Sequence, residues 1–107
     1  MLKEACVENF TNVPGVIERG AKRIELCDNL AVGGTTPSIG VIKITAEYCS
    51  DKDASIIVIL RPRGGDFVYS LMEKAIMMRD LEEIIASHAN GIAVGALTAV
   101  NDLDKPF

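Results

Sequence analysis

The sequence predicts an α/β fold built from parallel strands, and three observations support this prediction. Apolar, β-rich runs alternate with longer segments of helical periodicity, giving the order strand, helix, strand, helix, strand, helix, strand. Residues 55–60, SIIVIL, form an almost continuous aliphatic run that is typical of a parallel strand covered on both faces. Strands separated by helices pair in parallel through right-handed crossovers. A doubly wound sheet and half of a (β/α)8 barrel both fit this pattern.

The first strand–helix unit is expected at the start of the chain. Its strand covers Leu2–Cys6. Thr11 or Asn12 can cap the helix that follows, because the side-chain oxygen of either residue can accept a hydrogen bond from a free N–H group of the first turn. Pro14 suits that first turn, and Gly20 is expected to end the helix.

The second unit contains the clearest strand pattern. Polar and apolar side chains alternate with period two across Arg23–Cys27. A polar, glycine-rich loop follows at Asp28–Pro37, and Ser38 is placed to cap a helix that reaches about Cys49.

The third and fourth strands enclose the longest predicted helix. The strand Ser55–Leu60 is ended by Pro62 and the glycines that follow it. The helix covers about Ser70–His88, with apolar residues at helical spacing. The fourth strand is expected at Ile92–Leu97, and the last ten residues, Thr98–Phe107, are expected to contain a turn.

Composition indicates one globular domain, 1–107, and excludes several partners. The chain is 49% hydrophobic and 24% charged, with a net charge of −4, no basic cluster and no Trp, so no nucleic-acid partner is expected. No apolar run approaches the ~20 residues of a membrane-spanning helix, so no membrane partner is expected. Three cysteines without tight spacing do not form a disulfide framework, which favours a reducing, cytoplasmic location.

Charged side chains are expected near the carboxyl ends of the strands, where parallel α/β proteins place their ligand sites. Strands one to three deliver Glu4, Glu25 and Arg61 in that direction. A common interior would bring them together as a Glu–Arg–Glu cluster, serving either as a structural ion network or as the floor of a ligand site. Arg63 and the glycine-rich turns add donors that can cradle an anion, so these four residues are candidates for binding a small anionic metabolite, as an enzyme or a binder.

Two cysteines are predicted at strand ends. Cys6 and Cys27 end successive strands, which lie ~4.8 Å apart if they are neighbours in the sheet. Two thiols so placed can chelate a soft ion such as Cu(I), react as nucleophiles, or pack as small buried hydrophobes. Cys49 falls late in a helix, away from the strand ends. His88, the single histidine, lies at the opposite end from the strand carboxyl termini, so no Ser-His-Asp or Cys-His arrangement is expected.

Three motifs resemble those of the CutC-type copper homeostasis proteins. They are RIELC at 23–27, GGTTPSIG at 33–40 and ILRPRGGDFVY at 59–69. The segment Gly91–Leu97, with Gly95, fits the next strand of that family. The combined spacing of the motifs is highly specific, and the resemblance covers essentially all 107 residues.

The resemblance implies a TIM-type (β/α)8 barrel, a cytoplasmic location and a role in copper handling through Cu(I) binding to cysteine. Cys6 and Cys27 match the strand-end cysteine positions of the family. A complete barrel takes about 250 residues, so the chain is expected to be the N-terminal half, with four strands and three helices. It is then either a truncated product or half of an assembly. Two copies can close eight strands by two-fold symmetry, so a homo-oligomer that completes the barrel is expected.

Overall fold

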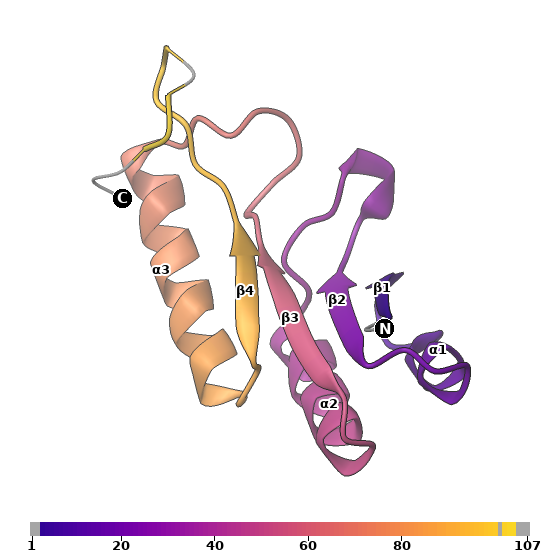
Figure 1. Cartoon of the computed structure of the whole chain (residues 1–107). Helices are drawn as coiled ribbons and strands as arrows, with labels where there is room; N and C mark the ends of the chain where they lie inside the picture. The colour runs from indigo at the N-terminus through magenta and orange to yellow at the C-terminus, as the bar shows by residue number, and fades with distance from the viewer. Residues whose placement is uncertain (1–2, 101, 105–107) are drawn as a thin grey trace.

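Four parallel strands form a single sheet in the order β1-β2-β3-β4 in the computed structural model of the chain, which describes residues 3–100 and 102–104 (Figure 1). Each consecutive pair of strands is joined through a helix, as the sequence predicts. The carboxyl ends of β2, β3 and β4 point toward the same end of the molecule, where the loops that follow them lie (Figure 1). The predicted α/β fold with parallel strands is confirmed.

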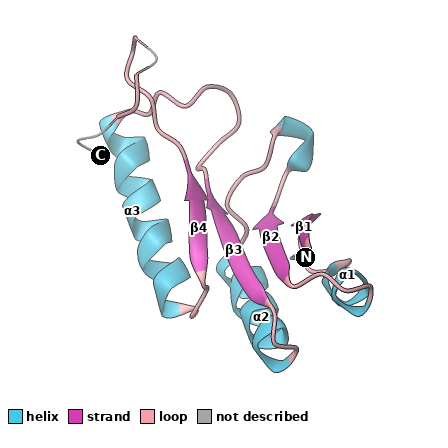
Figure 2. Cartoon of the chain, viewed as in Figure 1, coloured by secondary structure: helices cyan, strands magenta, loops and turns pink. Residues whose placement is uncertain are grey.

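The helices and strands alternate along the whole described chain (Figure 2). The strands are β1 Glu4–Glu8, β2 Arg23–Cys27, β3 Ser55–Leu60 and β4 Gly91–Val94. The helices are α1 Val13–Glu18, α2 Ile39–Asp51 and α3 Leu71–Ala86, and a short 3₁₀ helix, η1, covers Leu30–Val32 in the β2–α2 loop.

Two strand boundaries differ from the sequence prediction. The first strand was expected at Leu2–Cys6, but β1 extends to Glu8, since its backbone stays paired with β2 as far as Cys27. Leu2 itself lies outside the described residues. The fourth strand was expected to reach Leu97 but ends at Val94, because its partner strand β3 ends at the opposite residue, Leu60.

The predicted helix starts are confirmed, and their physical basis is visible at two of them. The Ser38 hydroxyl accepts a hydrogen bond from the Val41 N–H at 3.3 Å at the start of α2. At the start of α3, the Ser70 hydroxyl accepts from the Glu73 N–H, and the Glu73 carboxylate accepts from the Ser70 N–H, which forms a capping box. Asn12 precedes α1 without a side-chain cap.

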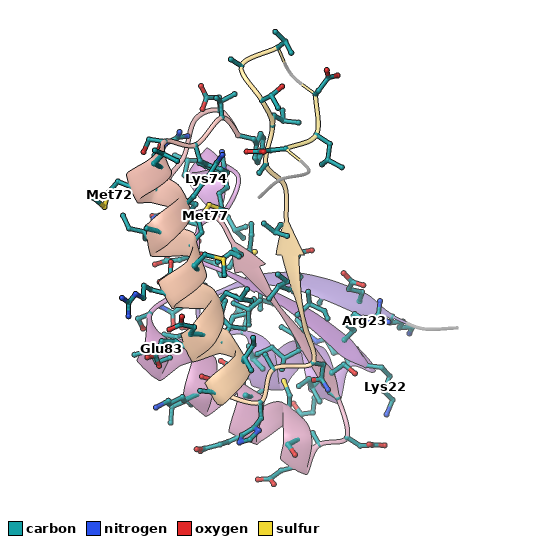
Figure 3. The ribbon with its side chains drawn as sticks, turned by 90° about the vertical axis from the view of Figure 1, so that its left-hand side faces the viewer. Lys22, Arg23, Met72, Lys74, Met77 and Glu83 are labelled. Carbon is teal, nitrogen blue, oxygen red and sulfur yellow. The ribbon has the colours of Figure 1, made fainter. Side chains whose placement is uncertain are left out.

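One face of the sheet packs against helices and forms the core. The strand residues of this face are Ile24, Leu26, Ile56, Val58 and Leu60, all buried. Helices α2 and α3 contribute Ile42, Ala46, Cys49, Met77 and Ile84. Figure 3 shows Met77 pointing from α3 toward the sheet, whereas Met72 points away and is exposed.

The other face of the sheet has no helix layer among the described residues. Its side chains alternate with the core positions along each strand. Cys27 is buried, and the others are half-buried or exposed: Glu4, Cys6, Arg23, Glu25, Ile57 and Ile59. A single sheet with helices on one face and an open opposite face is the arrangement of part of a TIM-type barrel.

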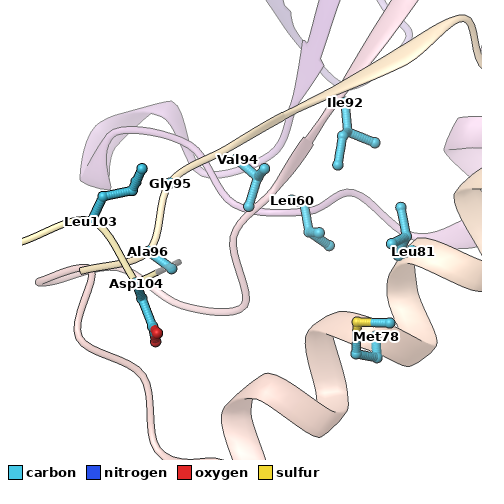
Figure 4. Close-up of a pocket in the computed structure, with 9 residues that line it drawn as sticks. All are labelled: Leu60, Met78, Leu81, Ile92, Val94, Gly95, Ala96, Leu103 and Asp104. Carbon is cyan, nitrogen blue, oxygen red and sulfur yellow. The ribbon is translucent and has the colours of Figure 1, made fainter. Parts of the chain in front are cut away.

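An apolar hollow of about 480 Å³ lies beside the last strand (Figure 4). Strand residues Leu60, Ile92 and Val94 line one side of it, and Met78 and Leu81 of α3 line the other. Leu103 and Asp104, near the end of the described chain, also line it. The edge of β4 and this hollow are apolar surfaces that, within residues 3–100 and 102–104, no further strand or helix covers.

Candidate metal-binding site

The two predicted strand cysteines lie side by side on the open face of the sheet. The parallel register places Cys6 of β1 opposite Glu25 of β2, and Glu8 opposite Cys27. Cys6 and Cys27 are therefore diagonal neighbours, and their Sγ atoms lie 3.8 Å apart, sharing a thiol hydrogen bond. Cys6 is not at a strand end as predicted, since β1 continues for two more residues.

A carboxylate completes the cluster. Sulfur atoms of Cys6 and Cys27 and a carboxylate oxygen of Glu25 all lie within 4.8 Å of one another. Glu25 was expected from the sequence to bind an anion together with arginines, whereas the structure brings it to the thiols. Three potential ligand atoms from two adjacent strands thus converge on one point of the open face.

The two thiols differ sharply in their exposure. Cys6 is exposed and lines a surface hollow of about 570 Å³ together with Glu8, Asn12 and Arg19. Cys27 is 1% exposed. The pair therefore has one sulfur that solvent and solutes can reach and one that is enclosed.

Gly34, in the β2–α2 loop, covers Cys27. It has a φ of +97°, a backbone conformation that side-chain-bearing residues rarely adopt. A Cβ at this position would lie 3.5 Å from the Cys27 Sγ and 3.1 Å from the Cδ1 of Ile59. Glycine therefore allows the loop to lie directly on the thiol.

Arg61 joins the β2–α2 loop, which contains Gly34, to the β3–α3 loop. Its Nη1 donates to the carbonyl oxygens of Val32 at 2.6 Å and Gly34 at 3.0 Å, and its Nη2 donates to the carbonyl oxygen of Gly65 at 2.7 Å. The guanidinium is also stacked over the ring of Phe67, 4.9 Å from its centroid. Arg61 is 7% exposed, so it is a buried cation that joins the β2–α2 and β3–α3 loops.

The expected Glu–Arg–Glu cluster does not form. Every hydrogen bond of the Arg61 guanidinium to the described residues goes to a backbone carbonyl, not to a glutamate. Glu4 pairs instead with Arg23 of the neighbouring strand, at 3.2 Å. The cause is position: Arg61 lies beyond the end of β3, among loops, whereas Glu4 and Arg23 are opposite each other at the start of their strands.

Arg63, the fourth predicted anion-binding residue, is occupied within its own loop. It forms ion pairs with Glu73 at the start of α3 and with Asp66, and it stacks on the ring of Tyr69. The hydrogen bonds from Arg63 and from the backbone of Ser70 lower the pKa of Glu73 to about 2. The partners Phe67, Tyr69 and Glu73 were missed from the sequence, although all belong to or follow the RPRGGDFVY motif.

The environment of Cys27 favours the protonated thiol. Burial, first, and then the nearby Cys6, Glu25 and Glu8 raise the pKa of the Cys27 thiol to about 12. The carboxylates of Glu25 and Glu8 have the opposite effect on a bound cation, because negative groups that oppose a thiolate attract a positive ion. A metal ion bound at this cluster would have to displace the thiol protons.

The remaining candidate residues lie away from this cluster. Cys49 is fully buried in the core contributed by α2, and burial raises the pKa of its thiol. His88 follows the end of α3 with a positive φ of 63° and lines a polar hollow near Ser50 and Asp53. Neither residue joins the thiol pair, as the sequence predicts.

A parallel βα sheet with a two-thiol, one-carboxylate cluster on its open face defines a partial TIM-type barrel with a candidate site for a soft metal ion. The chain belongs to the CutC family, whose model matches residues 1–107. A CutC family protein of Enterococcus faecalis is 51% identical over 105 residues, which cover 98% of this chain and 50% of that protein. The human copper homeostasis protein cutC homolog is 39% identical over 104 residues, covering 97% of this chain and 37% of that protein.

A solved structure supports the same assignment. The crystal structure of a CutC protein from Streptococcus agalactiae superposes with a TM-score of 0.93 at 44% sequence identity, covering 97% of this chain and 50% of that one. The chain thus spans about half the length of the Enterococcus relative and of this solved protein. Within the described residues, none of the helices combines the length and the apolar character needed to cross a membrane.

The difference in solvent exposure between Cys6 and Cys27 predicts which thiol is alkylated faster. Iodoacetamide is expected to modify Cys6 at least about tenfold faster than Cys27 at pH 7.5, because Cys6 is exposed and Cys27 is buried with a pKa of about 12. Peptide mapping by mass spectrometry after timed quenching measures both rates, and the core thiol of Cys49 serves as the internal slow standard. Equal rates at Cys6 and Cys27 would contradict the enclosure of Cys27.

Proposed function

We propose that the chain handles Cu(I) as cargo, bound by the sulfurs of Cys6 and Cys27. The observation that carries this proposal is the 3.8 Å separation of the two Sγ atoms on adjacent strands. Thiolates are the ligands that Cu(I) prefers, and a pair already in contact needs little rearrangement to share one ion. The names of the relatives, among them a human copper homeostasis protein homolog, point in the same direction.

The unequal exposure of the two thiols suits a cargo site. Cys6 lines the surface hollow and can take an ion from an incoming carrier, while Cys27 lies beneath the loop that Arg61 holds. An ion first captured by the exposed sulfur would then be shared with the enclosed one. Because thiols persist in reducing compartments, this function requires a cytoplasmic location, which we propose for the chain.

The alternative of an anionic metabolite receives less support from the geometry. Three guanidinium hydrogen bonds of Arg61 are directed at backbone carbonyls, and Arg63 is paired with Glu73 and Asp66. Donors already used in this way are not available to cradle a ligand. We therefore assign these two arginines to loop structure and not to binding.

The copper proposal is tested by substituting each cysteine. Loss of one sulfur is expected to weaken Cu(I) binding by more than ~100-fold, since removal of even an outer-shell partner costs 10- to 100-fold. Anaerobic competition against a Cu(I)-specific chelator measures this for Cys6→Ser, Cys27→Ser and the double variant. Cys49→Ala is the matched control, because that thiol is in the core. Unchanged affinity in the double variant would remove the proposed ligands.

We also propose that residues 1–107 form one domain, the N-terminal part of a barrel, which a second copy completes. Among residues 3–100 and 102–104, the edges of β1 and β4 pair with no further strand, and a two-fold axis would pair the β4 edge of one copy with the β1 edge of the other. The apolar hollow beside β4 supports this arrangement, because a further strand and helix would bury it (Figure 4). Val94 in this hollow is 51% exposed, and burying it favours association.

Light scattering coupled to size-exclusion chromatography tests whether two copies of the chain associate in solution. The expected mass is twice that of the chain, and Val94→Asp is expected to shift the population to monomer because it places a charge in the buried edge. Val100→Asp is the control, since Val100 is 77% exposed and lies outside the hollow. A monomeric mass for the wild-type chain over a hundredfold range of concentration would contradict the proposal.

A further inference from the structure

The carboxylate of Glu25 gives the thiol cluster a ligand that Cu(I) does not need. Its oxygen lies within 4.8 Å of both sulfurs, on the same face of the same pair of strands. Cu(I) prefers soft sulfur donors, whereas a borderline divalent ion such as Zn²⁺ accepts both thiolate and carboxylate ligands. The composition of the cluster therefore points to a second class of metal ion.

The spacing of the sulfurs fits tetrahedral coordination. With zinc–sulfur bonds of about 2.3 Å, two ligands of a tetrahedral ion lie about 3.8 Å apart. The Sγ atoms of Cys6 and Cys27 are separated by 3.8 Å. A carboxylate oxygen bound to the same ion lies about 3.6 Å from each sulfur, so Glu25 has to approach each sulfur by no more than about 1.2 Å. Glu25 is half-buried on the open face of the sheet.

The net charge of the metal–dithiolate complex differs between Cu(I) and Zn²⁺. One Cu(I) and two thiolates form a singly negative complex, which a neighbouring carboxylate repels. One Zn²⁺ and two thiolates form a neutral complex, which the carboxylate can join as a third ligand at moderate cost. Glu25 therefore opposes the monovalent ion and favours the divalent one.

We propose that Cys6, Cys27 and Glu25 bind Zn²⁺, and that Glu25 determines the preference of the site between a divalent ion and Cu(I). This inference rests on the thiol pair of the proposed function and extends it to a second metal. Three protein ligands leave the fourth tetrahedral position open, as in zinc sites that exchange or activate a ligand and unlike closed structural sites.

The matched pair Glu25→Gln and Glu8→Gln tests the assignment. Glu8 is also near Cys27, opposite it in the register, but it is exposed and outside the three-ligand cluster. Its charge acts on the site through solvent and is screened by salt, whereas that of Glu25 acts as a ligand. Zn²⁺ affinity is measured by competition with a chromophoric chelator, and Cu(I) affinity with a Cu(I)-specific chelator, on the reduced full chain under anaerobic conditions.

Glu25→Gln is expected to weaken Zn²⁺ binding at least ~tenfold, with Cu(I) binding unchanged or tighter, while Glu8→Gln has a much smaller effect on Zn²⁺. An equal effect of the two variants on Zn²⁺, or no effect of Glu25→Gln, overturns the inference. A far-ultraviolet circular dichroism spectrum identical to that of the wild-type chain shows that the variant is folded. If Glu25→Gln does not fold, the wild-type Co²⁺ complex decides: intense tetrahedral absorption with thiolate charge transfer supports the site, and a weak octahedral spectrum overturns it.

The two proposals fail separately. If the wild-type chain binds Zn²⁺ through Glu25 but does not bind Cu(I), the copper proposal is contradicted and the zinc proposal is supported. If the wild-type chain binds Cu(I) through both cysteines but shows no Glu25-dependent Zn²⁺ binding, the zinc proposal is contradicted and the copper proposal is supported.

Discussion

The parallel register between β1 and β2 is the constraint on which the candidate site depends. It sets Cys6 opposite Glu25 and Glu8 opposite Cys27, so the backbone ladder places both cysteines and Glu25 next to one another on one face. A slip of one residue would turn Cys6 to the core face, where helices pack, and would separate the thiols. The candidate ligands are thus positioned by the same hydrogen bonds that build the sheet, which would lower the cost of arranging them around a metal ion.

Arg61 provides the second constraint, on the loops above the sheet. A buried cation is costly, and this one is compensated by three carbonyl acceptors and the ring of Phe67. Its Nε has no hydrogen-bond partner among the described residues. In return, Arg61 holds the backbone of Gly34 over the thiol of Cys27. Arg61, which was expected to bind an anion, therefore shapes the cover of the candidate metal site.

The sequence was sufficient for the order of elements, because period-two strands, capping serines and the aliphatic run at Ser55–Leu60 are local signals. It was not sufficient for the strand limits, since those of β1 and β4 are set by the length of their partners in the sheet. The cysteine pair could be anticipated, but the position of Glu25 beside the thiols could not, because it depends on the register that sets Glu25 opposite Cys6. The backbone contacts of Arg61 could not be anticipated, because nothing local reveals that carbonyls from residues 32 and 34 will reach its guanidinium.

The proposed function requires the two sulfurs to hold one soft ion jointly. X-ray absorption at the copper edge of the anaerobic chain loaded with one equivalent of Cu(I) identifies the atoms bound to that ion. We predict a first shell dominated by two sulfur neighbours, which is lost in the double variant Cys6→Ser, Cys27→Ser. A first shell of nitrogen and oxygen neighbours alone, or a spectrum identical in wild type and the double variant, would contradict it.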